Sequence, residues 1–158
     1  MYAQAYLDYL YFFHAERDYF ECHEVLETEW KKRAADHRHS YWVTLIQLAV
    51  VLYHERRGNK KGAHILLNRL LKRIPLEHVQ LEHLGINPSK LLIDLHIRLK
   101  NLDEPFSDYD LPLTDSHLIK LCQVRAGDRW KSQSPLNNPN IIHKHILRHQ
   151  KPKIEEEE

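Results

Sequence analysis

Apolar side chains recur every three or four residues from residue 2 to about residue 102 of this chain. This spacing places them on one face of an α-helix, whereas the strict alternation typical of strands is absent from this stretch. Only four glycines interrupt the 158 residues, so few positions favour a break in helical structure. The pattern therefore predicts an all-α fold, a compact bundle of about five or six helices.

Breaks in the pattern predict where these helices begin and end. Gly58 suits the left-handed position after one helix, Asn59 suits the N-cap of the next, and Pro75 ends that next helix. Asn87 and Pro88 form a cap followed by a proline at the first helical position. The expected helices span residues 2–14, 19–33, 41–57, 60–74, 76–84, 88–102 and 117–124, with a further short helix at 141–149.

The helical pattern fails at residues 103–113. Prolines and aspartates there are interleaved with Phe106, Tyr109 and Leu111, which predicts an extended strap lying across the core. After Arg125 the chain becomes polar and ends in four glutamates. We therefore expect a helical bundle domain over residues 1–125 and a polar, partly ordered C-terminal extension over residues 126–158.

Charge and cysteine content narrow the class of protein. The 23 basic and 22 acidic residues give a net charge of +1, which argues against a surface devoted wholly to nucleic acid or membrane binding. The longest apolar stretch, residues 45–53, is far too short to span a membrane. Cys22 and Cys122 fit buried thiols better than a disulfide framework. We therefore expect a cytoplasmic protein with no membrane association.

The helix expected at residues 19–33 carries acids beside its apolar stripe. Cys22, Leu26 and Trp30 form the stripe, and acidic side chains line one edge of it. Half-buried carboxylates need partners, and the following helix offers interior polar residues seven positions apart, on one stripe. The predicted polar cluster contains His23, Glu24, Glu27, Trp30, Gln47 and His54.

These residues belong to two motifs that occur in order along the chain. The first contains Phe20, Glu21, His23, Glu24, Leu26, Glu27 and Trp30, and the second contains Gln47, His54 and the helix-turn positions Gly58, Asn59, Gly62 and Ala63. Together they resemble the uncharacterised family catalogued as domain of unknown function 309, over roughly residues 5–75. The resemblance implies a compact, intracellular, all-helical fold, and it implies no activity because none is established for the family.

Two interpretations of the cluster remain open. The segment from His23 to Glu27 is similar to the zinc-protease pattern H-E-x-x-H, but Glu27 stands in place of the second histidine. With His54 as a third ligand, these two side chains would form a metal site with an open position for water, as in a metal-dependent hydrolase. Alternatively, Glu24 or Glu27 accepts hydrogen bonds from His54 and Gln47 in a structural network. The same groups would also allow acid/base chemistry without a metal. We prefer the structural network, expect no cofactor, and assign no catalytic residue.

Two further hypotheses concern the helical hairpin at residues 41–74. Seven bases and one acid lie between residues 54 and 73, a charge balance that would allow binding of RNA or of an acidic partner through phosphate or carboxylate contacts. Nucleic acid is disfavoured because no aromatic residues are interleaved with the bases as a stacking platform. The hairpin also resembles one tetratricopeptide-type unit, although a single unit cannot bury a core. The sequence thus favours a non-catalytic structural or partner-binding domain. It leaves the partner unidentified, with a protein as the candidate.

Overall fold

The computed structural model describes residues 2–32 and 40–149. Within these ranges the regular structure is helical, and the predicted all-α fold is confirmed. The helices of eight or more residues are six: α1 (Gln4–Tyr11), α2 (Tyr19–Lys32), α3 (Ser40–Arg56), α4 (Lys60–Arg73), α6 (Pro88–Lys100) and α7 (Ser116–Ala126). The shorter α-helices are α5 (His78–His83), α8 (Pro139–Ile142) and α9 (Lys144–His149). The expected end of the second helix at Arg33 lies outside the described residues.

Short helical turns join some of these elements. A π-helical turn, Phe12–Glu16, follows α1, and 3₁₀ turns at Ile74–Glu77 and Gly127–Arg129 precede α5 and follow α7. Asp18, Asn59 and Asn87 cap α2, α4 and α6, and each side chain accepts a hydrogen bond of 3.1 Å from the backbone N–H three residues later. The breaks expected from the sequence are therefore real helix ends.

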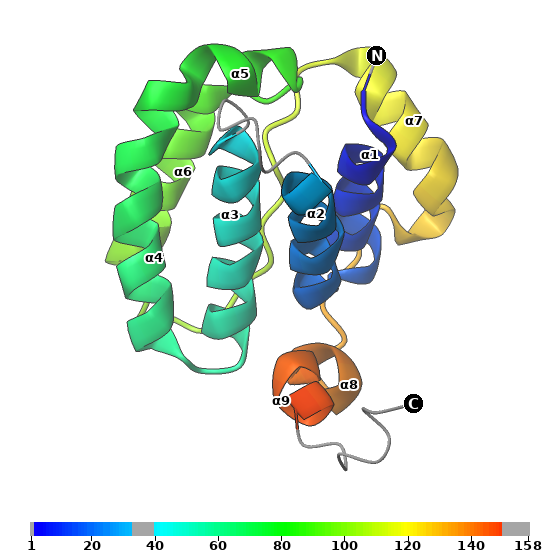
Figure 1. The fold of residues 1–158 in the computed structure, drawn as a ribbon. Coiled ribbons are helices and arrows are strands. Elements are labelled where there is room, and N and C mark those ends of the chain that lie inside the picture. Colours follow the sequence, from blue (N-terminus) through cyan, green and yellow to red (C-terminus); the bar gives the residue numbers. More distant parts are fainter. Residues whose placement is uncertain (1, 33–39, 150–158) are drawn as a thin grey trace.

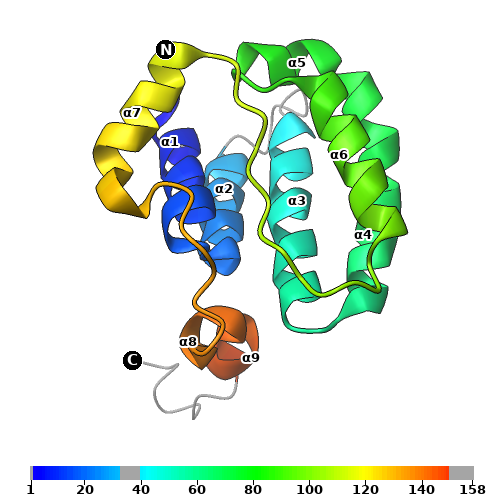
Figure 2. The ribbon, with the colours of Figure 1, turned by 180° about the vertical axis from the view of Figure 1, so that it is seen from behind.

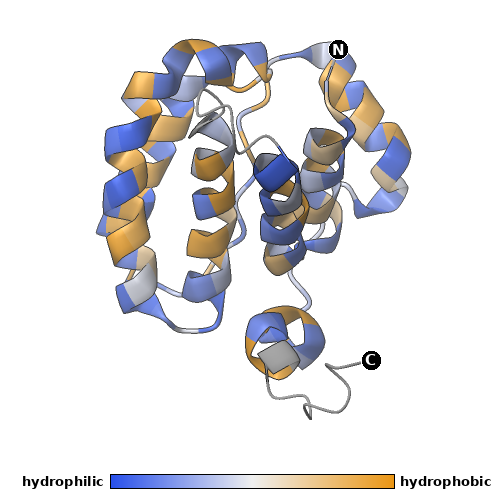
Figure 3. Ribbon diagram, in the orientation of Figure 1, coloured by the Kyte–Doolittle hydropathy of each residue, from blue (hydrophilic) through white to orange (hydrophobic). Residues whose placement is uncertain are grey.

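The helix α3 lies at the centre of the fold. It packs between α2 and α4, while α1 lies beside α2, α7 beside α1, and α6 beside α4 (Figure 1). Hydrophobic residues occur on most of its turns (Figure 3), and Leu45, Leu48, Val51 and Leu52 are almost fully buried. A helix that is apolar nearly all round has to be covered on several sides, which explains its position.

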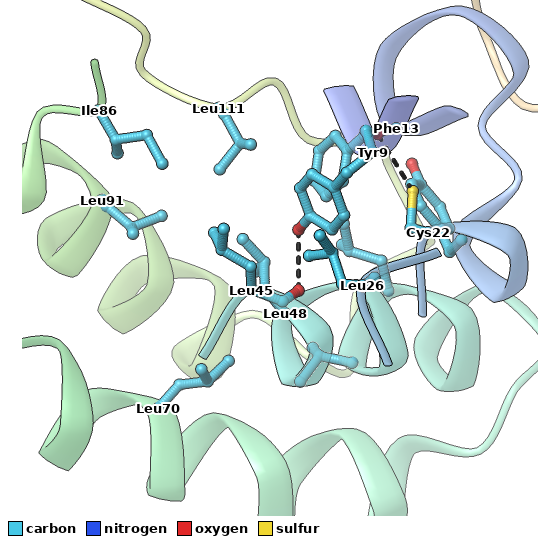
Figure 4. Packing of buried hydrophobic residues seen from close by; sticks show 14 of the residues in the cluster. Tyr9, Phe13, Cys22, Leu26, Leu45, Leu48, Leu70, Ile86, Leu91 and Leu111 are labelled. Carbon is cyan, nitrogen blue, oxygen red and sulfur yellow. Dashed lines mark hydrogen bonds between the residues drawn. The ribbon is translucent and has the colours of Figure 1, made fainter. Parts of the chain in front are cut away.

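Tyrosine hydroxyls and a thiol are satisfied inside this core (Figure 4). The Tyr9 hydroxyl donates to the Leu45 carbonyl at 2.8 Å, and the Cys22 thiol donates to the Tyr9 carbonyl at 3.4 Å. Cys22 and Cys122 are both free and buried, as predicted. These contacts join α1 to α3 and α2 to α1, and they give the buried Tyr9 hydroxyl and Cys22 thiol hydrogen-bond partners.

The expected strap is present at residues 103–113. It runs along the back of the bundle from the end of α6 toward α7 (Figure 2). Leu111 is buried, the backbone N–H of Asn87 donates to the Pro112 carbonyl at 2.8 Å, and Leu113 forms an isolated antiparallel bridge with Ile86. The strap therefore covers the core and is anchored at the start of α6.

Two buried arginines hold the strap and the C-terminal extension on the bundle. Arg17, in a left-handed conformation with φ of 54°, donates to the carbonyls of Tyr109 and Ser132 at 2.8 and 2.7 Å and to Asp110 at 2.7 Å. Arg56 donates to the Arg17 carbonyl at 2.6 Å. This network could not be predicted from the sequence, because neither arginine belongs to a recognisable motif.

Arg56 also reaches the C-terminal extension. Its guanidinium donates to the Ser134 hydroxyl at 3.1 Å and to the Ile141 carbonyl at 3.3 Å. The described part of the extension, residues 126–149, thus lies against the bundle, and residues 150–158 lie outside the described residues. The division of the chain at residue 125 stays a prediction.

His14 is a fully buried histidine between α1 and the strap. Its Nδ1 lies 3.0 Å from the Leu10 carbonyl, and the Leu111 backbone N–H donates to its Nε2 at 3.1 Å. These contacts fit a neutral ring with the proton on Nδ1. Burial is the main reason that the pKa of His14 falls from 6.5 to about 4. A proton added to Nε2 would face the Leu111 N–H.

Acid should therefore destabilise the fold through His14. The unfolded chain binds this proton below about pH 6.5 and the folded chain only near pH 4, so the stabilising contribution is complete above pH 6.5 and falls as the pH drops through this window. A pKa difference of this size corresponds to about 3 kcal/mol of unfolding free energy. Chemical denaturation at several pH values should show a flatter acid limb for His14→Gln than for the wild type.

The control for this measurement is His64→Gln, which changes an exposed histidine on α4. Its pH profile should match that of the wild type. An acid limb of equal slope in His14→Gln and the wild type would contradict the role given to His14.

Candidate functional site

The carboxylate of Glu27 finds its partners on its own helix. Its Oε2 lies 2.6 Å from His23 Nε2, and its Oε1 lies 2.8 Å from Lys31 Nζ. Both are i, i+4 pairs on α2. The pKa of Glu27 is lowered, first by the hydrogen bond from Lys31 and also by the charge of His23. Glu27 is therefore ionised, and the ammonium group of Lys31 offsets its negative charge.

The other residues of the predicted polar cluster do not bind one another and have separate surroundings. His54 Nδ1 accepts from the Asn59 amide at 3.2 Å, whereas Gln47 Oε1 is buried without a hydrogen-bond partner. Glu24 lines a surface groove with Ala5 and Asp8 of α1. Among the described residues, the expected bonds from His54 and Gln47 to Glu24 or Glu27 are not formed, and this detail of the interpretation was wrong.

The expected bonds are replaced by bonds to partners that lie closer along the chain. Lys31 and His23 reach Glu27 one turn away on the same helix, and Asn59 reaches His54 from the turn directly after α3. Such local partners need no second helix in precise register. Trp30, the remaining member of the cluster, is half-buried and packs against the hydrophobic core.

What the structure does bring together is His23 and His54, in a pocket between α2, α3 and α9. The pocket has a volume of about 180 Å³. Its lining residues are Tyr19, Phe20, His23, Val50, Tyr53, His54 and His145. Two histidines of the predicted cluster therefore share a space whose other walls are mostly aromatic.

Phe20 stands at the centre of this aromatic arrangement. Its ring centroid lies 5.8 Å from that of His23, 6.0 Å from that of Tyr53 and 5.6 Å from that of His145. The Tyr53 and His54 centroids are 6.0 Å apart. Tilted rings at these separations attract one another through their quadrupoles, so the pocket walls are held in place by ring contacts.

The helix α9 closes one side of the pocket. The backbone N–H of His145 donates to the Tyr53 hydroxyl at 2.8 Å. Next to it, Lys144 Nζ lies 2.7 Å from Asp18 Oδ2 and 3.3 Å from Glu21 Oε2. Sequence reasoning missed both His145 and Tyr53 as lining residues, because nothing in the spacing shows which helix a C-terminal segment will meet.

Burial also sets the protonation of His54. Its pKa is lowered from 6.5, mainly by burial and further by Arg57 and His145. At neutral pH this imidazole is therefore neutral. With its Nδ1 accepting from Asn59, its remaining ring nitrogen carries the proton.

The candidate metal ligands His23, Glu27 and His54 do not form a three-ligand site in this arrangement. In residues 2–32 and 40–149, no three His, Cys, Asp or Glu side chains are gathered so as to hold a metal ion. His23 Nε2, one of the two ring nitrogens that can bind a metal, is bonded to Glu27. The expectation of no cofactor stays a prediction, which metal analysis of protein purified without a histidine tag can check.

The helix-turn positions shape the end of α3, where His54 lies. Gly58 has a φ of +90°, a conformation that favours glycine. A Cβ on Gly62 would lie 2.7 Å from the Asn59 amide nitrogen, the group that bonds His54. Ala63 is fully buried. These four positions therefore set the turn that fixes His54.

Comparison with known proteins now places the chain. The family model described as Domain of unknown function (DUF309) matches residues 6–66. The uncharacterised protein YpuF of Bacillus subtilis is 42% identical over 164 aligned positions, which cover all of this chain and 94% of that relative. The chain belongs to the DUF309 family. No solved structure matches it.

The matched region of this DUF309 protein runs from α1 into α4 and includes every predicted site residue. It supplies all the pocket residues from α2 and α3, whereas His145 lies outside it. Among the described residues of the DUF309 chain, no helix has both the length and the apolar character needed to cross a bilayer.

The ion pair of Lys144 should control how firmly α9 closes the pocket. Lys144→Met leaves Asp18, whose side chain is 4% exposed, without this cation, at a cost of about 2 kcal/mol in docking. Amide exchange at residues 144–147 should then speed up by about tenfold or more. Hydrogen exchange followed by mass spectrometry measures this.

Lys120→Met, on the exposed side of α7, removes the same charge without touching α9 and should leave that exchange unchanged. Equal protection of α9 in Lys144→Met and in the wild type would show that the ion pair does not hold the helix.

Proposed function

We propose that this protein is a non-catalytic helical domain that binds a partner protein, and that its pocket receives one apolar or aromatic side chain of that partner. The observation that carries the proposal is the aromatic and histidine lining around Phe20. Residues of both family motifs contribute to this lining, and the Glu27 carboxylate beside it is already bonded to His23 and Lys31.

The size of the pocket supports a side chain as its occupant. Pockets for drug-sized ligands have volumes of about 300–1,000 Å³, whereas this one has about 180 Å³. A metabolite of ordinary size would not be enclosed. A leucine or phenylalanine side chain matches a small cavity with ring walls, in the way that an anchor residue fills a pocket in a protein interface.

The chemistry of the lining supports binding over catalysis. Glu27 lies 2.6 Å from His23 Nε2 and is ion-paired with Lys31 at 2.8 Å, so Lys31 already offsets its charge. His54 is neutral and bonded to Asn59. What remains available among the described residues is apolar ring surface, the second ring nitrogen of His54 and Nδ1 of His23, which suits the capture of an apolar side chain with a neighbouring polar group.

We also propose a cytoplasmic location for this domain. Two free buried thiols support it, because reducing compartments keep cysteines in this form.

A direct test uses two small probes that carry only the expected side chains, N-acetyl-phenylalanine amide and N-acetyl-leucine amide. We expect each to cause saturable NMR shifts at Phe20, Tyr53 and His54, because these rings line the pocket. N-acetyl-lysine amide should cause none. Val50→Phe, which places a ring in the pocket, should weaken probe binding about tenfold or more.

Val79→Phe is the matched control, since Val79 is 60% exposed on α5 and lies outside the pocket lining. It should bind the probes as the wild type does. The proposal fails if neither probe gives saturable shifts at the pocket residues, or if Val50→Phe binds them with unchanged affinity.

A further inference from the structure

A second surface is formed by the solvent-exposed sides of α4 and α6. The two helices lie side by side and run in opposite directions (Figures 1 and 2). Lys60, at the start of α4, donates to the carbonyl of Glu104, just after α6. We call this surface the α4–α6 face. Its exposed residues include Lys61, Ile65, Arg69, Lys72, Ile93, Ile97 and Lys100.

The α4–α6 face is strongly basic although the whole chain is nearly neutral. The sequence of α4 contains no aspartate or glutamate. The one acid of α6, Asp94, is already held by Lys90 at 3.1 Å and by the Tyr109 hydroxyl at 2.7 Å. The exposed acids Asp103 and Glu104 follow α6 at one end of the face, so along the two helices themselves the field is set mainly by the bases.

Most exposed bases of the face are also unpaired. Lys90 is bound to Asp94, but within the described parts of the chain no ion pair involves the four other exposed bases, which are Lys61, Arg69, Lys72 and Lys100. Elsewhere on the surface, Lys31 and Arg125 meet carboxylates at 2.8 and 2.7 Å. The face thus has positive charge available for an external partner.

Three isoleucines lie among these bases. Ile65, Ile93 and Ile97 are 46%, 58% and 53% exposed, and Ile93 and Ile97 are one turn apart on α6. Figure 3 shows hydrophobic and hydrophilic positions interspersed along α4. Aliphatic side chains with a charged surround are the arrangement of a protein interface, whose apolar centre is enclosed by a polar rim.

Nucleic acid and lipid fit this face less well. The sequences of α4 and α6 contain no phenylalanine, tyrosine or tryptophan, so the face lacks the large aromatic platform on which single-stranded nucleic acid stacks, and phosphates would leave the isoleucines without partners. Exposed polar residues, His64, Asn68 and His96, occur on the same faces of the helices. These residues interrupt the apolar surface, so it lacks the continuous apolar stripe that an interfacial membrane helix needs.

We propose that the α4–α6 face binds an acidic amphipathic helix of a partner protein. The aliphatic residues of that helix pack on Ile65, Ile93 and Ile97, and its carboxylates meet the four unpaired bases. Complementary charge and an apolar centre are the two features that such helix-binding surfaces combine. This surface is separate from the pocket and does not depend on its function.

Fluorescence anisotropy with a labelled synthetic helical peptide tests the proposal. The peptide carries leucines on one face and glutamates on both flanks. We expect saturable binding to the full chain, weakened about tenfold by the double change Ile93→Ser and Ile97→Ser, and also by Lys61→Glu with Lys72→Glu. Val124→Ser and Lys120→Glu, equivalent changes on exposed positions of α7, should leave binding unchanged.

Three outcomes would overturn the proposal, provided that thermal melting shows each variant to be folded. One is no binding of the peptide to the wild type. Another is equal binding of a peptide in which serine replaces leucine, which would reduce the face to a site for any polyanion. The third is tighter binding of duplex RNA or phosphatidylglycerol vesicles that the isoleucine changes leave unaltered. Val50→Phe should not affect peptide binding, so failure of the pocket and failure of this face are distinguishable.

Discussion

The burial of α3 between α2 and α4 is the constraint on which the rest of the structure depends. Because Leu45, Leu48, Val51 and Leu52 lie around the helix and are buried, it has to be covered by helices on opposite sides and by the strap behind it. Its last turn then carries Tyr53 and His54 to the edge of the core, beside Phe20 and His23 of α2. The pocket is thus a consequence of where the apolar helix ends.

The polar residues on this framework separate into local and distant pairs. Glu27 is satisfied by partners one turn away on α2, and His54 by the turn that follows α3. Arg17 and Arg56 instead bind carbonyls and carboxylates that arrive from distant parts of the chain. The local pairs of Glu27 and His54 leave ring surfaces exposed at the pocket. The distant pairs of Arg17 and Arg56 hold the strap and the C-terminal extension in place. One part of the molecule is therefore made rigid while another stays available for binding.

Acidic and basic residues are also concentrated on different helices. Acids of α2 meet Lys144 and Lys31 near the pocket, whereas α4 carries bases and no acid. A net charge of +1 conceals this asymmetry, because it sums groups that face different directions. A pocket on one side and a basic, isoleucine-bearing face on another give a small domain two chemically different surfaces.

The sequence by itself determined the helices, their caps, the extended strap and the buried thiols, because each depends on periodicity or on neighbours a few residues apart. It also marked His23 and His54, since polar residues on apolar stripes need an explanation. Only the tertiary structure decided that these histidines meet around Phe20 and not around Glu24 and Glu27, and that His145 completes the lining. The same holds for Arg17 and Arg56. Their partners are up to 115 residues away, and no local pattern encodes which distant carbonyl a buried guanidinium will reach.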